Sequence, residues 1–126
     1  MNIPDNLLYS ADHEWVRIEG NKAVIGVTDY AQDALGDVVY VDIPNVGANA
    51  SSGDTVSEVE STKSVSDIFA PLSGTIVEVN QDLANAPELL NVDPYGEGWI
   101  CVIEFAGASL TEDLLTPEQY REVIES

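Results

Sequence analysis

The sequence predicts a mainly β protein, a β-sandwich or flattened barrel of about seven short strands with one or two short helices and a C-terminal helix. Three observations predict this class. The 126 residues are 44% hydrophobic and 21% charged, which is typical of a globular chain. Short runs rich in β-branched residues recur along the chain, and Gly, Pro, Asn and Asp separate them. No linker or low-complexity segment interrupts the pattern, so we expect one domain over residues 1–126.

The first half of the chain predicts a hairpin, a helix and a strand. The alternating runs of the hairpin flank a turn that contains Gly20. Thr28 is a favoured N-cap and Gly36 a favoured helix stop, so a short helix is expected between them. A β-branched run ends at Pro44 and predicts a strand. In order, we expect strands at 13–18 and 23–27, a helix at 29–35, a strand at 37–43 and a loop at 44–54.

The second half predicts a second hairpin, two further strands and a terminal helix. Asn80 is placed to cap a loop or short helix, and a dense turn cluster precedes a long apolar run. Thr116, Pro117 and Gln119 fit the N-cap, first-turn and capping-box positions of a helix. In order, we expect strands at 55–60, 65–70, 75–79 and 99–105, and a helix at 117–125.

The charge balance is strongly acidic. There are 23 Asp and Glu against four Lys and Arg, a net charge of −19. Binding of nucleic acid or of an anionic membrane needs clustered basic side chains and is not expected. Protein partners should instead present basic surfaces. The four bases are Arg17, Lys22, Lys63 and Arg121.

Cysteine and histidine are too scarce for the common catalytic and metal-binding constellations. The single Cys101 cannot form an internal disulfide, and with the single His13 it cannot build a zinc site. No nucleophile elbow or phosphate-binding glycine loop is present, so we expect no catalytic residue and no enzyme activity. We interpret His13 as a structural or surface residue and Cys101 as a buried, inert thiol. No signal sequence follows Met1, which predicts a cytoplasmic protein; a removed transit peptide is the alternative.

Lys63 is the most informative single position. It is one of two lysines and lies between two similar runs, 56–60 and 65–69. If Thr62 and Lys63 are the central residues of a tight turn, Ser61 faces Ser64, Glu60 faces Val65 and Val56 faces Phe69. A tight turn would present the amine of Lys63 outward, at a fixed place. An enzyme that modifies lysine needs that presentation, although a lysine on a surface turn is also common without modification.

Segments in both halves of the chain resemble one known family. Around Lys63 these are 53–56, 59–64, Asp67 and 71–80; before it, 9–10, 13–15, 26–32 and 35–37; after it, 91–96 and 98–100. In sequence and order they are similar to the glycine cleavage system H proteins, lipoyl carriers of the biotinyl/lipoyl-like superfamily. The resemblance covers nearly the whole chain. It implies the barrel-sandwich hybrid fold and a carrier rather than a catalyst.

The resemblance also implies a cofactor and partners. Lipoic acid would be amide-linked to Lys63, at a hairpin tip formed with Glu60, Ser61, Thr62 and Ser64. The lipoyl group would accept an aminomethyl unit from the pyridoxal-phosphate enzyme glycine decarboxylase. An aminomethyltransferase would pass the unit to tetrahydrofolate, and dihydrolipoamide dehydrogenase would reoxidise the lipoyl group. Lipoyl-attaching enzymes would be further partners, and a monomer is expected.

By the same resemblance, the loaded arm would fold into a cleft that involves Glu14 and Asp67, with Asp12 at its rim. Carboxylates suit this role because they can hold the protonated amine of the aminomethyl unit, which we call the load, by charge-assisted hydrogen bonds. Two other functions stay open from the sequence. One is an H-protein-like carrier that relays lipoyl groups to other enzymes, and the other is an acidic interaction domain without lipoate.

Overall fold

The structure, a computed structural model, describes residues 2–107 and 113–125. The strands are β1 (Leu8–Tyr9), β2 (Glu14–Glu19), β3 (Lys22–Val27), β4 (Val38–Val41), β5 (Asn49–Ala50), β6 (Thr55–Ser61), β7 (Val65–Phe69), β8 (Gly74–Val79) and β9 (Cys101–Glu104). The helices are α1 (Asp29–Leu35), the 3₁₀ turn η1 (Gln81–Ala84), α2 (Leu89–Val92) and α3 (Pro117–Glu125).

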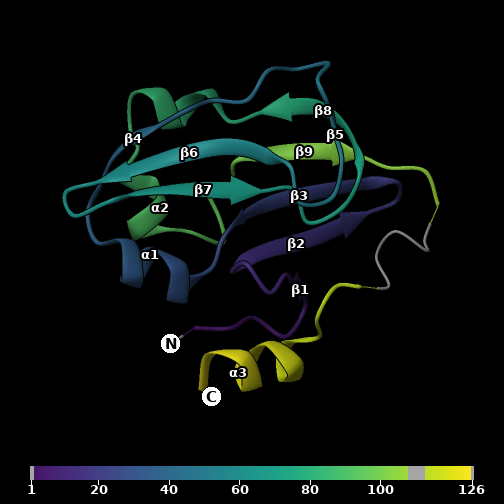
Figure 1. The fold of residues 1–126 in the computed structure, drawn as a ribbon, viewed down its shortest axis with the longest axis horizontal. Coiled ribbons are helices and arrows are strands. Elements are labelled where there is room, and N and C mark those ends of the chain that lie inside the picture. The colour runs from purple at the N-terminus through teal and green to yellow at the C-terminus, as the bar shows by residue number, and fades with distance from the viewer. Residues whose placement is uncertain (1, 108–112, 126) are drawn as a thin grey trace.

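Two antiparallel sheets face each other and enclose the main core (Figure 1). Among the described residues, the larger sheet has the strand order β1-β2-β3-β9-β8-β5 and the smaller has β4-β6-β7. Apolar side chains from both sheets meet between them, including Val16 and Ile25 from the larger and Val59 and Ile68 from the smaller. The predicted mainly β sandwich with short helices and a C-terminal helix is therefore confirmed.

The predicted helix boundaries are confirmed by their caps. The hydroxyl of Thr28 accepts the N–H of Ala31 at 3.2 Å, and Gly36 ends α1 with φ 81°. In the same way, Asn80 accepts the N–H of Asp82 before η1. Each cap satisfies a backbone donor that the first helical turn leaves free, which is why the sequence signal was reliable here.

Two short strands were not predicted. Strand β1 lies in the segment before β2, residues 2–13, which we call the leader, and it pairs with β2. Strand β5 lies inside the expected loop and pairs with β8. Each strand is only two residues long, which is too short to show an alternation of apolar and polar residues. Only its pairing in the folded protein defines it as a strand. Two predicted strands are shorter than expected, since 37–43 narrows to Val38–Val41 and 99–105 to Cys101–Glu104.

The register of the β6–β7 hairpin is as expected near its tip and shifts farther away. Glu60 pairs with Val65, as predicted. The predicted partner of Phe69 was Val56, which is wrong: Phe69 pairs with Thr55, because the register shifts between Thr55 and Ser57. A bulge of this kind adds one residue to one strand only and moves every later pair by one position.

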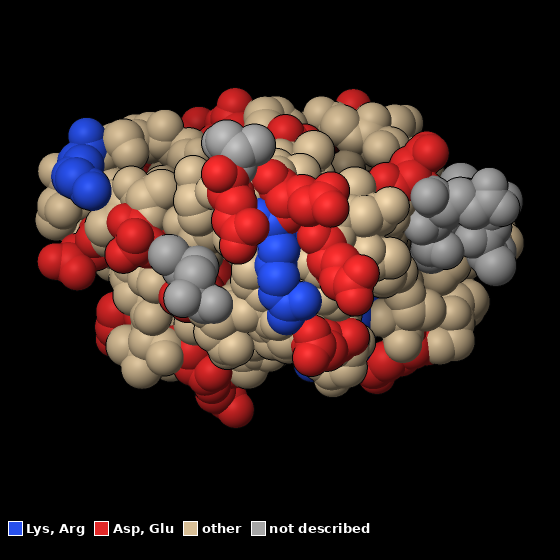
Figure 2. All heavy atoms as spheres, turned by 90° about the horizontal axis from the view of Figure 1, so that it is seen from below, with Lys and Arg blue, Asp and Glu red and all other residues tan. Residues whose placement is uncertain are grey.

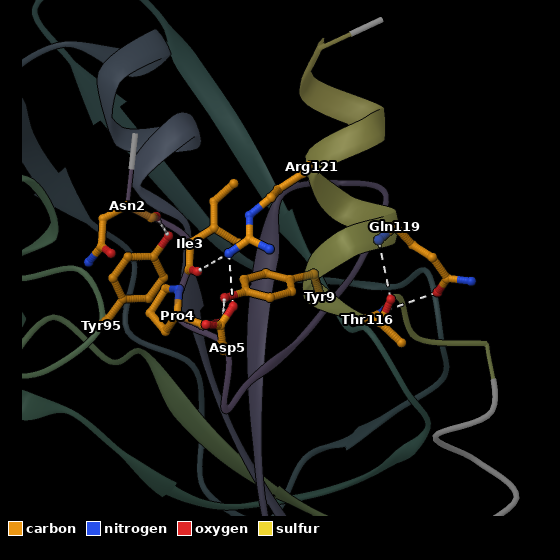
Figure 3. A network of polar contacts seen from close by, with 9 residues as sticks. All are labelled: Asn2, Ile3, Pro4, Asp5, Tyr9, Tyr95, Thr116, Gln119 and Arg121. Carbon is orange, nitrogen blue, oxygen red and sulfur yellow. Dashed lines mark hydrogen bonds and ion pairs between the residues drawn. The ribbon is translucent and has the colours of Figure 1, made fainter.

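A second apolar cluster lies on the outer face of the larger sheet and holds the chain ends together. Tyr9 of β1 stacks on Tyr120 of α3 with ring centroids 4.7 Å apart. Figure 3 shows Arg121 of α3 donating to the carbonyl of Ile3 at 3.1 Å and to the carboxylate of Asp5 at 2.8 Å. The N-terminal segment is thus fixed between the sheet and α3. No helix in the described part of the chain is long and apolar enough to cross a membrane.

The capping box of α3 is present as predicted. The N–H of Thr116 donates to the side chain of Gln119 at 3.0 Å, and the N–H of Gln119 donates to the hydroxyl of Thr116 at 3.2 Å (Figure 3). This reciprocal pair starts the helix at Pro117 and so sets the position of Tyr120 over β1.

Candidate functional site

The β6–β7 hairpin ends in a tight turn that the side chain of Ser61 holds together. The N–H of Ser61 donates to the carbonyl of Ser64 at 2.8 Å. The hydroxyl of Ser61 accepts the N–H groups of Lys63 and Ser64, at 3.2 and 3.1 Å. Thr62, Lys63 and Ser64 are all exposed. The four predicted residues 61–64 therefore form one hydrogen-bonded turn, which we call the hairpin tip.

The hairpin tip is also attached to the junction between α1 and β4. The N–H of Thr62 donates to the carbonyl of Asp37 at 3.0 Å, and Ser61 pairs with Val38. The sequence predicted an outward lysine at a fixed place on a tight turn, and it did not predict this attachment. In the structure the tip is exposed but backed by this junction, which lies beside it at the end of the hairpin (Figure 1).

A cleft of about 280 Å³ opens beside the hairpin tip, between α1 and β7. We call it the arm cleft. Its apolar lining comes from Val27, Tyr30, Ala31, Ala34, Leu35, Val65 and Ile68, and its polar lining from Asp12, His13, Ser64, Ser66 and Asp67. This volume is at the small end of the range for ligand sites, which suits a slender chain rather than a bulky ligand.

Two of the three predicted cleft carboxylates line the arm cleft, and the third is buried beside it. Asp12 and Asp67 line the arm cleft and are exposed. Glu14 is only 1% exposed and is not part of that lining. Its carboxylate accepts the hydroxyl of Ser10 at 2.6 Å and the N–H of Phe69 at 3.4 Å. Glu14 thus joins the leader to β7 next to the cleft.

The environment of Glu14 changes its acidity. Burial raises the pKa of Glu14 to about 7; the hydrogen bonds from Ser10 and Phe69 oppose this shift, and the nearby charge of Asp12 adds to it. Burial disfavours the charged form of a carboxyl group because the interior solvates it poorly. Glu14 is therefore a buried group that takes up or releases a proton near neutral pH.

Glu60, the remaining predicted site residue, is exposed on β6 and lies opposite Val65 and Tyr40. It does not line the arm cleft. Sequence reasoning missed Ala31 and Leu35 as cleft residues. They lie four residues apart on α1, and helical spacing places them on one face, but nothing in the sequence says which element that face meets.

The interpretations of His13 and Cys101 agree with the structure. Nδ1 of His13 lies 2.9 Å from the hydroxyl of Tyr120, and its ring lies against Tyr30. His13 has φ 70°, and burial lowers its pKa. Cys101 is buried in β9, and burial raises its pKa to about 12, so the thiol stays protonated and unreactive.

Acidic side chains dominate the face that carries α3. Figure 2 shows them spread over this face around isolated basic groups. Two ion pairs, Arg17–Glu19 and Arg121–Asp5, form among the described residues and use two of the four bases. In this part of the chain most acidic side chains therefore lie outside an ion pair. Such a surface attracts positively charged partners over a distance.

Comparisons with known proteins agree on one family. The family model for the glycine cleavage H-protein matches residues 7–126. A glycine cleavage system H protein of Bacteroides thetaiotaomicron is 52% identical over 98% of both chains, and one of Bacillus subtilis is 50% identical over 98% of this chain and 97% of its own. A crystal structure of a glycine cleavage system H protein from Mycobacterium marinum superposes with a TM-score of 0.89 at 41% identity, over 98% of this chain and all of that chain. The chain therefore belongs to the glycine cleavage H-protein family, the non-catalytic carriers that bear lipoate on a lysine in the glycine cleavage system.

Proposed function

We propose that Lys63 is the lysine that carries lipoate, as an amide between the lipoyl carboxyl carbon and Nζ. One observation carries this assignment: Lys63 is an exposed residue on a hydrogen-bonded hairpin tip whose next residues, Ser64 and Val65, line the arm cleft. Lys22, the other lysine, lies at the start of β3 opposite Glu19 and Glu104, and it does not line the arm cleft. The single domain 1–126 is part of the same proposal.

The residues of the arm cleft fit a lipoyl arm. When attached, the group supplies a disulfide that accepts the aminomethyl unit and later releases it. The apolar lining from α1 and β7 can pack against the methylene chain of the arm. Asp12 and Asp67 can hold the protonated amine of the load by charge-assisted hydrogen bonds, and an arm packed along the apolar lining would displace water from it.

Glu14 contributes to the same proposal from a buried position. An arriving ammonium group near Glu14 would favour its ionised form, because an opposite charge lowers the pKa of a carboxyl. Its bonds to Ser10 and Phe69 fix the orientation of the carboxylate before the load arrives. Glu14 would thus gain a counter-charge when the arm docks and lose it when the arm leaves.

The specific partners are glycine decarboxylase, the aminomethyltransferase, dihydrolipoamide dehydrogenase and the lipoyl-attaching enzymes, which the carrier meets in turn as a cytoplasmic monomer. A tethered arm has a high effective concentration at each active site, so weak protein contacts suffice. The acidic surface supports such weak, steered encounters. A carrier that relays lipoyl groups to other enzymes would use the same lysine, and reconstitution with the three glycine cleavage enzymes distinguishes the two functions.

Intact mass after incubation with a lipoyl-attaching enzyme tests the assignment. The Lys63→Arg variant should gain no lipoyl mass, whereas the matched Lys22→Arg variant should be lipoylated like the parent. A lipoyl adduct on the Lys63→Arg variant would refute the proposal. If the parent gains no mass at all, an acidic interaction domain without lipoate is the better description.

A further inference from the structure

The side chain of Lys63 does not extend freely from the hairpin tip but lies across a bare glycine. A Cβ placed on Gly36 would lie 2.6 Å from Cε of Lys63, 3.6 Å from Cδ and 3.4 Å from Nζ. These distances show that the end of the lysine side chain occupies the space that any other residue at position 36 would fill. Gly36 itself has φ 81° and ψ −159°, a region that only glycine adopts without strain.

The chain neighbours of both residues in this contact line the arm cleft. Ala34 and Leu35 precede Gly36 and line the cleft, and Ser64 and Val65 follow Lys63 and line it as well. The lysine therefore lies across the end of α1 at the place where the cleft begins. An arm that continues from Nζ starts beside the cleft instead of in open solvent.

The backbone that presents Gly36 is held by one side chain, Asn91 from α2. Its amide oxygen accepts the N–H of Val38 at 2.9 Å, and its amide nitrogen donates to the carbonyl of Gly36 at 2.8 Å. The same nitrogen lies 3.1 Å from Oε1 of Gln32 on α1, to which it donates. Asn91 therefore fixes the groups on both sides of Asp37.

Asp37 connects this arrangement back to the hairpin tip. Its carbonyl accepts the N–H of Thr62 at 3.0 Å, next to Lys63. Only an amide can serve at position 91, because one end must accept from Val38 and the other must donate to Gly36. A carboxylate of the same shape would place a second acceptor against the carbonyl of Gly36.

We propose that Gly36 and Asn91 are positioning residues for the lipoyl arm, which together direct the Lys63 side chain toward the arm cleft. This inference rests on the assignment of Lys63 as the lipoyl-lysine. Fixing the first bonds of a tether raises the time that its far end spends at a nearby site. The arrangement would thereby favour docking of the loaded arm without any contact between Asn91 and the load.

The mobility of Lys63 can be measured directly in the unmodified protein. With only two lysines, ¹³Cε-labelled lysine gives two signals, and Lys63→Arg assigns them. We expect Cε of Lys63 to be more ordered than Cε of Lys22 in the parent. Gly36→Ala and Asn91→Asp should lower the order of Lys63 to that of Lys22. Equal mobility in the parent, or an ordered Lys63 in the folded variants, would overturn the proposal.

The matched controls isolate the two contacts. Gly20→Ala also places a side chain at a positive φ, 65°, but with nothing within 4 Å of the new Cβ. Asn49→Asp makes the same chemical change as Asn91→Asp at an exposed amide that accepts from Thr75. Both controls should leave Lys63 ordered. Should Gly36→Ala not fold, Asn91→Asp carries the test, because it keeps the bond from Val38.

A second measurement links this mobility to the load. The lipoylated and loaded variants should release formaldehyde and ammonia to water about fivefold faster than the parent, which corresponds to roughly 1 kcal/mol of weaker docking. Decay at the parental rate in both folded variants would contradict the proposal. Absence of lipoate on Lys63 would instead refute the proposed function, and the NMR result, which needs no lipoate, would still stand.

Discussion

Replacing Glu14 with Gln should make the protein more stable at alkaline pH, in proportion to the cost of the buried charge. Burial raises the pKa of Glu14 from 4.5 to about 7. Below about pH 4.5 the carboxyl is protonated in both the folded and the unfolded chain and contributes nothing. As the pH rises toward 7, the unfolded chain releases the proton and the folded chain keeps it, so stability is lost across this window.

The magnitude follows from the same values. The interval from 4.5 to about 7, at about 1.4 kcal/mol for each pH unit, amounts to about 3 kcal/mol once the pH is above 7. A glutamine stays neutral, and its amide can still accept from Phe69 and donate to Ser10, the two partners that Glu14 has now. The stability gap between variant and parent should therefore widen by roughly 2–3 kcal/mol between pH 5 and pH 8.

Urea unfolding at pH 5, 6, 7 and 8 measures this gap, and the thermal midpoints should diverge by roughly 5–10 °C over the same range. Glu58→Gln is the matched control, because it removes one negative charge from an exposed position on β6. Its gap to the parent should stay nearly constant with pH. A constant gap for Glu14→Gln as well would show that Glu14 titrates as an ordinary carboxyl and would refute the reasoning.

Three further predictions concern the load, the partners and α3. Asp67→Ala should release the arm and speed the hydrolytic decay of the load by about 10–100-fold, the loss expected for one charge-assisted hydrogen bond, whereas Glu58→Ala should not; intact mass over time measures both. The apparent KM of glycine decarboxylase for the lipoylated protein should rise as the Debye length falls from about 10 Å at 0.1 M to about 3 Å at 1 M salt, and a flat KM would exclude steering. Tyr120→Phe removes a hydroxyl that contacts His13 and Thr28 and should cost about 1–3 kcal/mol in urea unfolding; an unchanged midpoint would contradict this role.

The position of Lys63 shows how far local sequence reasoning reaches. Its place at a tight turn was predictable, because Ser61 precedes it and two similar runs flank it. The contact with Gly36 was not, since these two residues are 27 positions apart in the sequence and meet because Ser61 pairs with Val38 and Thr62 bonds to Asp37. Periodicity describes single elements and contains no information about which element they meet.

Glu14 shows the same limit of local sequence reasoning for the chemistry of the site. The sequence places an acid in a predicted strand next to Trp15, among 23 acids that are hard to tell apart. In the structure, Glu14 is only 1% exposed and accepts hydrogen bonds from Ser10 in the leader and Phe69 in β7. Its burial between these distant segments raises its pKa to about 7.

The sequence by itself determined the sandwich class, the caps of α1 and α3, the tight turn and its lysine, because each depends on neighbours within a few residues. It also determined the acidic surface, which is a sum over side chains. Only the tertiary structure decided the register shift at Val56, the pairing of β1 and β5, the arm cleft and the burial of Glu14. These features depend on contacts between distant segments, whose geometry is fixed by how the whole core packs.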